Sequence, residues 1–269
     1  MRDITIGQYY PVDSVIHSLD PRSKMMSVFL YIVALFLVKN PLWYLLFLAI
    51  TLAEYRAARV PFGYFLKGLK GIIILLLFTF FFRMVATPGE LLAQFWIFEI
   101  TKEGLIKGTQ LASRIALMIT EASLLSYTTT PKELADGLTK AFSPLKKIGI
   151  RTDEIAIMIM IAFRFIPVML EEANNLMDAQ ASRGVEFENC SVFTRTKNVF
   201  TLLMPLFIGS IERSADLAMA MEARGYSGAN ERSKMYPLEY KRRDHIAYLV
   251  LLGYMLVMFL VSRFVKIAF

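Results

Sequence analysis

The 269-residue sequence has a single cysteine, Cys190, and only two histidines, His17 and His245. One cysteine excludes an internal disulfide and any zinc site built on cysteines. The two histidines lie far apart, and neither has a second metal ligand at a typical spacing. The sequence therefore predicts neither a bound metal nor a cofactor.

Motifs that bind nucleotides or perform hydrolysis are also missing. There is no G-x-x-x-x-G-K-[ST] loop to cradle phosphates, and no G-x-S-x-G or H-E-x-x-H sequence. Residues 1–10 are polar and lack the apolar core of a cleavable signal peptide. These absences predict a protein that is not an enzyme, so any powered work depends on another subunit.

Hydrophobic residues make up 56% of the chain and the mean hydropathy is +0.49, which is too apolar for a soluble domain. Charged residues still account for 20%, which predicts a protein partly in the membrane and partly in water. The net charge of +7 does not indicate nucleic-acid binding, because the basic residues flank apolar runs, as the positive-inside rule describes.

The apolar runs predict an all-α integral membrane protein with about five transmembrane helices. Asp20-Pro21 and Asn40-Pro41 each have the pattern of an N-cap followed by proline at the first helical position. Helices of about 18 residues are ~27 Å long, just enough to span a membrane. The predicted spans are residues 21–38, 41–59, 66–82, 105–127 and 246–261, and residues 83–103 are predicted to form a mixed loop.

The sequence between the last two spans is of a different kind. Thr130-Pro131 opens a capping box that predicts a short helix to about Ser143. Two long amphipathic helices are predicted after it, one from residue 152 or 153 and one over residues 197–224, and they contain Pro167 and Pro205. We therefore expect N-terminal transmembrane helices over residues 1–127, a coupling domain over 128–244, and a C-terminal transmembrane helix over 245–269.

Lysine and arginine indicate the orientation. Residues 54–70 and 232–243 are rich in basic residues, which predicts that both segments are cytoplasmic and that the 83–103 loop is external. Residues 128–244 then lie in the cytoplasm, and the protein is a multi-pass protein of the cell membrane. Lys39, Arg263 and Lys266 would lie on the outer side, against this rule.

Three ionisable residues fall within apolar runs. Arg114 and Glu121 lie two turns apart on one face of the fourth span, and Arg164 stands near Pro167. Ionisable groups at membrane depth are costly and invite a functional hypothesis. Nothing else builds a substrate pocket around them, so we expect them to satisfy polar groups and to tie helices together. In the same span, Gly104 and Gly108 match a close-packing motif.

Two segments repeat each other at a shift of 41 residues, which aligns Arg183-Gly184 with Arg224-Gly225. Each has the pattern of a helix that ends at a glycine and leaves an arginine in its last turn. Arginine also stands well at a helix C-terminus for electrostatic reasons alone. Because the pattern occurs twice, we favour two docking points for carboxylate-bearing partners.

Several motifs together resemble the transmembrane T component (EcfT) of energy-coupling factor transporters and the related permeases of cobalt and nickel importers. Ser18 departs from the resemblance, because family members often have arginine there. The motifs are residues 11–24, which include Asp20-Pro21-Arg22, residues 126–134, residues 143–147, the stretch from Arg164 through Pro167 to Glu172, Ser182-Arg183-Gly184, and Ala223-Arg224-Gly225.

The resemblance implies a T component that sits in membrane lipid between two cytoplasmic ABC-type ATPases and one or several small substrate-binding membrane subunits. Arg183 would engage acidic residues of one ATPase, and Arg224 those of the other. Asp20, Pro21, Arg22, Arg164 and Pro167 would serve structure or a partner surface. ATPase motion would reach the substrate-binding subunit, which releases a vitamin or other micronutrient inward.

Two further hypotheses remain open. Within the same class, the chain could be the permease subunit of a cobalt or nickel importer. From another class, a self-contained secondary transporter would require inverted repeats and broken helices at a midplane site, whereas the repeat here is direct and short. A membrane-embedded enzyme would require clustered acids or histidines, which the sequence lacks. The sequence does not identify the substrate.

Overall fold

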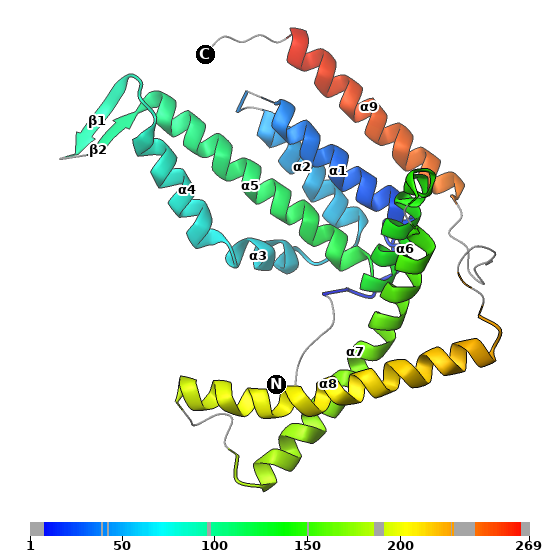
Figure 1. The fold of residues 1–269 in the computed structure, drawn as a ribbon. Coiled ribbons are helices and arrows are strands. Elements are labelled where there is room, and N and C mark those ends of the chain that lie inside the picture. Colours follow the sequence, from blue (N-terminus) through cyan, green and yellow to red (C-terminus); the bar gives the residue numbers. More distant parts are fainter. Residues whose placement is uncertain are drawn as a thin grey trace. The chain divides into compact units, whose positions relative to one another are not determined.

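The computed structural model describes residues 8–38, 40–41, 43–95, 98–149, 151–185, 191–226, 228 and 240–264. These residues fall into two compact units (Figure 1). We call the described part of residues 5–138 and 238–269 the bundle unit, and that of residues 139–237 the crossed-helix unit.

The bundle unit is built around a long central helix, α5, which contacts four other helices. The predicted start of α1 is confirmed, because the Asp20 side chain accepts a hydrogen bond from the N–H of Arg22 and proline occupies the first turn. The helices of this unit are α1 Pro21–Leu37, α2 Trp43–Ala57, α3 Phe62–Lys70, α4 Ile73–Ala86, α5 Lys102–Thr128, α6 Pro131–Ala141, whose last residues pass into the other unit, and α9 Arg242–Phe264.

The predicted third span is a bent pair of helices rather than one helix. α3 and α4 meet at a bend of 59°, and the break lies at Gly71, a residue that weakens helix continuity. By length and apolar composition this pair together could cross a membrane, whereas none of the helices in the described residues meets both criteria alone.

The predicted loop between the third and fourth spans contains a short β-hairpin. Strand β1 (Leu91–Phe95) pairs antiparallel with β2 (Phe98–Thr101), with Gln94 opposite Glu99. Apolar and aromatic residues favour strands once a partner strand is available. Apart from this hairpin and a 3₁₀ turn, the regular elements of the described residues are α-helices, as the predicted all-α class requires.

Helices α4 and α5 pack at the glycines of the close-packing motif. A side-chain carbon at Gly104 would overlap the carbonyl oxygen of Met84, and one at Gly108 would lie 3.0 Å from that of Phe80. Glycine therefore allows the two backbones to approach closely. The match to a close-packing motif is a weak signal, because the two glycines lie at a helix start, yet α4 and α5 do meet there.

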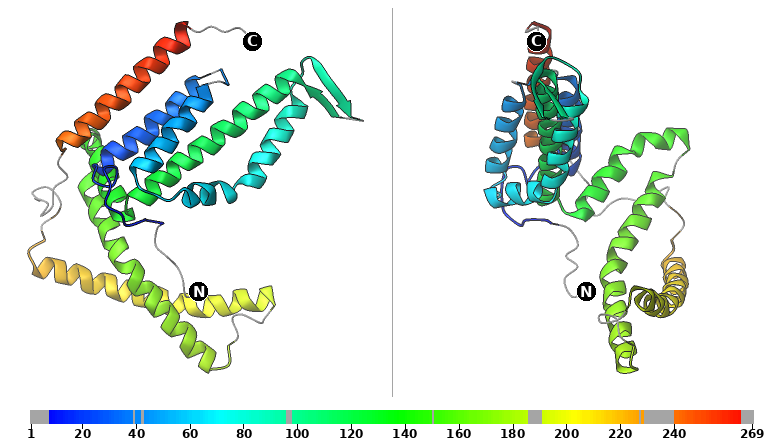
Figure 2. Two further views of the ribbon diagram at one scale, coloured as in Figure 1. Left: turned by 180° about the vertical axis from the view of Figure 1, so that it is seen from behind. Right: turned by 90° about the vertical axis from the view of Figure 1, so that its left-hand side faces the viewer.

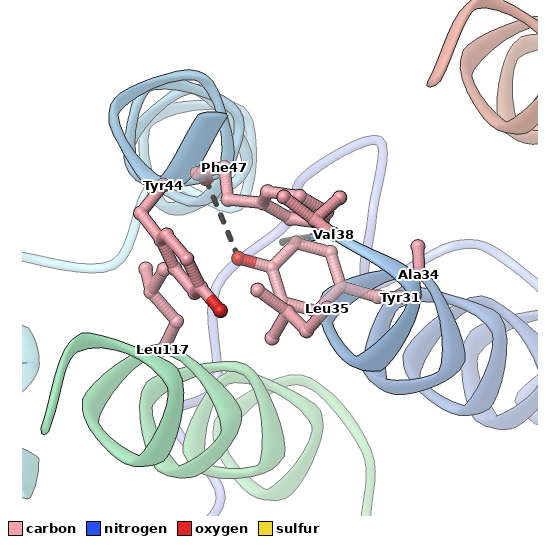
Figure 3. Packing of buried hydrophobic residues seen from close by; sticks show 7 residues of the cluster. All are labelled: Tyr31, Ala34, Leu35, Val38, Tyr44, Phe47 and Leu117. Carbon is pink, nitrogen blue, oxygen red and sulfur yellow. Dashed lines mark hydrogen bonds between the residues drawn. The ribbon is translucent and has the colours of Figure 1, made fainter. Parts of the chain in front are cut away.

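Two apolar clusters hold the bundle unit together. In the first, Tyr31 packs edge-on against Phe47 (Figure 3). The Tyr31 hydroxyl also lies 2.7 Å from Oγ1 of Thr51. Helices α1, α2 and α5 and the C-cap of α1 contribute the buried members of this cluster, which are Tyr31, Ala34, Leu35, Val38, Tyr44, Phe47 and Leu117. The second cluster joins α2, α3 and α5 through Tyr55, Ala58, Val60, Phe65, Leu124 and Tyr127.

The crossed-helix unit consists of a 3₁₀ turn, Ser143–Ile148, and the helices α7 (Thr152–Ser182) and α8 (Val192–Ala223), which cross each other (Figure 2). The predicted start of α7 is confirmed. α8 begins five residues before the predicted Lys197, because the side chain of Ser191 accepts a hydrogen bond from the N–H of Thr194 and caps the helix there.

Candidate functional site

The two Arg-Gly sequences end α7 and α8 in the same way. Gly184 and Gly225 have positive φ angles of 87° and 75°, and each follows an arginine at the C-cap. The N–H of each glycine donates to the carbonyl three residues earlier, at 2.9 Å in both copies. The predicted glycine at the C′ position is therefore confirmed in both helices.

The residue after each glycine completes the cap. The N–H of Val185 donates to the carbonyl of Gln180 at 3.1 Å, and that of Tyr226 donates to Met221 at 3.0 Å. Bonds with this spacing, together with those of the glycines, define a Schellman motif, which satisfies the last carbonyls of a helix. The two ends are thus the same local structure built twice.

The arginine of each cap is exposed, as are the residues directly before it, Ser182 and Ala223. Within the described residues, neither Arg183 nor Arg224 takes part in a salt bridge. A planar guanidinium on a rigid helix end can form two parallel hydrogen bonds to a carboxylate. Chemically, the two ends can therefore serve as a pair of cationic anchors.

The two helices are joined where they cross. Nη2 of Arg213 on α8 donates to Oε2 of Glu172 on α7 at 2.7 Å. Gly209 faces the same carboxylate, since a side-chain carbon there would lie 3.1 Å from Oε1 of Glu172. The Ser210 hydroxyl lies 3.3 Å from the sulfur of Met169. Sequence analysis placed Glu172 in a family motif but did not find its partner, although the two residues are 41 apart, the same shift as the repeat.

The helix interior of α7 contains Pro167, and that of α8 contains Pro205, as predicted. Arg164 and Pro167 are exposed on α7, and no hydrogen bond or salt bridge among the described residues involves the Arg164 side chain. The expectation that Arg164 ties helices together thus stays a prediction, and its position leaves it open to a partner.

The N-terminal motif closes one end of the bundle unit. Asp20 is buried and accepts hydrogen bonds from Nε and Nη2 of Arg22, both at 2.9 Å. Its own N–H donates to Oδ1 of Asp244 at 2.7 Å, across 224 residues of sequence. Burial opposes ionisation of Asp20, but the hydrogen bonds and positive charge of Arg22 outweigh it and lower the pKa of Asp20. The Asp20 carboxylate thus caps α1 and binds Arg22, whereas its backbone N–H joins the start of α1 to Asp244 of α9.

Lys24 is a buried residue that contacts the same end of the bundle unit. It is only 5% exposed, and its Nζ donates to the carbonyl oxygens of His17 at 3.0 Å and Thr128 at 2.9 Å. The guanidinium of Arg22 lies 3.9 Å from the ring centre of Tyr240. Pro21 is buried and lies against Gly137 of α6. Asp20 and Arg22 therefore connect the starts of α1 and α9, Pro21 packs against α6, and Lys24 adds the end of α5.

Sequence analysis missed Lys24 and Asp244 as members of this cluster. Asp244 had a local signal, because its Oδ2 accepts the N–H of Lys241 at 2.8 Å, as an acidic residue in the first turn of a helix often does. Lys24 belongs to the motif over residues 11–24, but nothing in the sequence shows its burial, since a lysine beside a helix start is ordinarily solvated.

Of the two ionisable residues of the fourth span, Arg114 has the polar partner expected of it. Nε and Nη2 of Arg114 donate to the hydroxyl of Tyr44 at 3.1 and 2.9 Å. Glu121 is buried on α5, and its Oε2 has no hydrogen-bond partner among the described residues. The prediction is therefore confirmed for Arg114, whose bond to Tyr44 joins α5 to α2, and stays a prediction for Glu121.

Comparison with known proteins places these features in a family. Residues 13–236 match the CbiQ family, which is described as cobalt transport protein. The chain belongs to the CbiQ family. The match includes the Asp20 motif, Arg164 and Pro167, and both Arg-Gly helix ends.

Curated relatives of this CbiQ family member share one name, energy-coupling factor transporter transmembrane protein EcfT. The protein of that name from Acidaminococcus fermentans is 40% identical over 253 residues, 94% of each chain. The one from Clostridium kluyveri is 43% identical over 251 residues, 93% of each chain. The one from Bacillus subtilis is 39% identical over 245 residues, 91% of this chain and 92% of its own. The resemblance inferred from the motifs is confirmed.

Proposed function

We propose that this chain is the transmembrane energy-coupling subunit of an energy-coupling factor importer in the cell membrane. It transmits the motion of two ABC-type ATPases to one or several small membrane subunits that bind a vitamin or other micronutrient. In this proposal the chain itself hydrolyses no ATP and binds no cofactor or nucleic acid. Its near full-length similarity to proteins named EcfT supports this function.

The observation that carries the proposal is the duplicated helix end. A subunit that works between two ATPases needs two anchors, and α7 and α8 end in the same Schellman cap with an exposed arginine, Arg183 or Arg224. We assign one ATPase to each arginine, with Ser182, Gly184, Ala223 and Gly225 shaping the two contacts. A charged hydrogen bond of this kind contributes about 1–3 kcal/mol.

The crossing of α7 and α8 suits a coupling role. Two helices of 31 and 32 residues form levers, and the Arg213–Glu172 bond ties them at one point. A displacement applied at one helix end then reaches the other helix through this crossing. In the proposal, residues 128–244 form a cytoplasmic coupling domain, and the exposed Arg164 and Pro167 on α7 belong to the surface that meets the substrate-binding subunit.

The second candidate is a cobalt or nickel importer permease, which the name of the matching family favours. The name of the curated relatives favours an energy-coupling factor transporter. Uptake of radiolabelled vitamins and of Co²⁺ or Ni²⁺ by the complete complex in proteoliposomes separates the two. A self-contained secondary transporter would take up its substrate without the ATPases, so uptake by this chain alone would contradict the coupling proposal.

The decisive experiment replaces the two exposed arginines, Arg183 and Arg224, by alanine. Arg183→Ala and Arg224→Ala are introduced singly and together, and ATPase co-purification and ATP-driven uptake are measured. Each single change should weaken ATPase binding by about 1–3 kcal/mol, and the double change should abolish co-purification.

A matched control is Arg151→Ala, which removes an exposed arginine from the start of α7 rather than from its end. This variant should retain the ATPases and uptake. Full assembly and uptake in the Arg183→Ala/Arg224→Ala double variant would refute the proposed role of the helix ends.

A further inference from the structure

A cavity lies along α4 and α5 in the bundle unit, and its lining includes no residue of the Asp20 cluster. Its volume is about 340 Å³, within the range of ligand sites, and it is lined by Arg83, Lys107, Gln110, Leu111 and Arg114. Residues 107, 110, 111 and 114 follow the spacing of one helix face, and Arg83 comes from the last turn of α4. Three of the five lining residues are cations, and none is an acid.

These cations lack acidic partners within the described residues. Glu103 is four residues before Lys107, the spacing of a helical ion pair. Its Oε2 instead accepts the N–H of Glu90 at 2.7 Å, and no salt bridge joins it to Lys107. Arg83 likewise has no carboxylate partner. The cavity therefore keeps its positive charge.

Arg114 is held in place by neutral groups only. Its Nη2 donates to the Tyr44 hydroxyl at 2.9 Å and to the carbonyl of Val38 at 3.4 Å. Tyr44 points its ring and hydroxyl from α2 toward α5 (Figure 3). The Arg114 guanidinium also lies 5.1 Å from the ring centre of Phe36. These contacts fix the position of Arg114 without neutralising its charge.

The level of the cavity follows from the same contacts. Val38 ends α1, and Tyr44 lies in the first turn of α2, so Arg114 lies beside the α1–α2 connection. The Asp20 cluster lies at the other end of α1, a helix of 17 residues or about 25 Å. With that cluster on the cytoplasmic side, as the basic residues of α9 indicate, the cavity lies at the outer face, where the positive-inside rule disfavours cations.

We propose that Arg83, Lys107 and Arg114 bind the phosphate of an anionic phospholipid headgroup of the outer leaflet. A membrane supplies this ligand at the depth of the cavity, and the apolar faces of α4 beside it accommodate the acyl chains, since Phe78 and Phe82 are both more than 60% exposed. A phosphate accepts several charge-assisted hydrogen bonds at once, and it offsets the mutual repulsion of the three cations.

The test uses the purified full-length chain and native mass spectrometry during titration with dioleoyl-phosphatidylglycerol. Each basic side chain near an anionic membrane surface contributes about 1 kcal/mol, or roughly fivefold in affinity. Arg83→Gln and Lys107→Gln should each weaken binding roughly fivefold, and together by more than tenfold. Lys107→Arg keeps the positive charge and should bind the lipid as the native chain does. This variant therefore distinguishes a loss of charge from a loss of folding as the cause of weaker binding.

Lys102→Gln is the matched control, because it removes an exposed cation from the same end of α5 without touching the cavity. An equal loss of phosphatidylglycerol affinity in Lys102→Gln would show that the lipid contact is non-specific and would overturn the proposed site. No loss of affinity in the Arg83→Gln/Lys107→Gln double variant would overturn it as well. Two further ligands test its chemistry. Zwitterionic phosphatidylcholine should bind more weakly and respond less to the substitutions. Inorganic phosphate that binds as tightly as phosphatidylglycerol and displaces it would overturn the lipid assignment in favour of a soluble phosphate.

Discussion

Arg213 of α8 donates a 2.7 Å hydrogen bond to Glu172 of α7 at the point where the two longest helices of the chain cross. Both side chains remain about a third exposed. An ion pair with that exposure contributes about 0.5–1 kcal/mol to stability, so the pair sets the geometry of the crossing more than it holds the fold.

The first prediction follows from this pair. Arg213→Met should leave the unfolding temperature nearly unchanged but reduce ATP-driven uptake, because α7 and α8 lose the hydrogen bond between Arg213 and Glu172 at their crossing. The double exchange Glu172→Arg/Arg213→Glu should recover part of the activity by restoring the pair. Arg151→Met removes an exposed arginine that pairs with Glu154 within α7 alone, and it should leave uptake intact. Spin-label distances between α7 and α8 report the crossing directly, and unchanged distances and uptake in Arg213→Met would contradict this role.

The second prediction concerns the α4–α5 contact. Gly104→Ala places a methyl group against the backbone carbonyl of Met84, which cannot move aside like a flexible side chain. We expect a loss of about 1–3 kcal/mol in unfolding free energy, measured by denaturant titration in mild detergent. Gly253→Ala in α9 meets no atom within 4 Å and should stabilise the chain by about 0.5–1 kcal/mol. Equal effects at the two glycines would refute close packing at Gly104.

The structure shows which features sequence patterns could predict. Local signals performed well: Asp20 caps α1, Thr130 and Glu133 exchange the two hydrogen bonds of a capping box, and Gly184 and Gly225 end their helices. Each of these depends on residues within one or two turns, so the sequence carries the whole signal.

The features that could not be predicted depend on distant residues. The bond between Asp20 and Asp244 and the bond between Arg114 and Tyr44 join helices far apart in sequence. The hairpin at β1 and β2 needs a partner strand, which a single run of apolar residues does not reveal. The third span is predicted as one helix over residues 66–82, and its bend of 59° depends on tertiary packing.

The third prediction tests the orientation of the chain in the membrane. In a Cys190→Ser background, Pro88→Cys lies in the expected external connection and Met219→Cys in the expected cytoplasmic domain, and both positions are exposed. A thiol reagent that cannot cross the membrane should label intact cells at Pro88→Cys only. Permeabilised cells should show labelling at both positions, which controls for reactivity. Labelling of Met219→Cys alone in intact cells would reverse the proposed topology.

The fourth prediction is a pH dependence from Asp20. Its pKa in the folded protein lies below that of the unfolded chain, which is about 3.9 for aspartate. The carboxylate therefore stabilises the fold above the unfolded pKa, and this contribution is lost as the pH falls through the folded pKa. Asp20→Asn should lower the unfolding temperature at pH 7, and the difference from the native chain should shrink below about pH 4. A difference that stays constant with pH would show that the charge of Asp20 contributes nothing.

The last prediction concerns the glycines that cap the two anchors. A residue with a side chain at φ of 87° or 75° costs about 1–2 kcal/mol, and asparagine tolerates this conformation better than other residues. Gly184→Val and Gly225→Val should therefore unwind the caps, misdirect Arg183 and Arg224, and weaken ATPase co-purification, although the arginines remain. Gly184→Asn and Gly225→Asn should retain most of the binding, because they keep the left-handed turn. Because nothing lies within 4 Å of either glycine, steric crowding cannot account for a difference between valine and asparagine. Equal ATPase binding by the two sets of variants would mean that the cap does not orient the anchor.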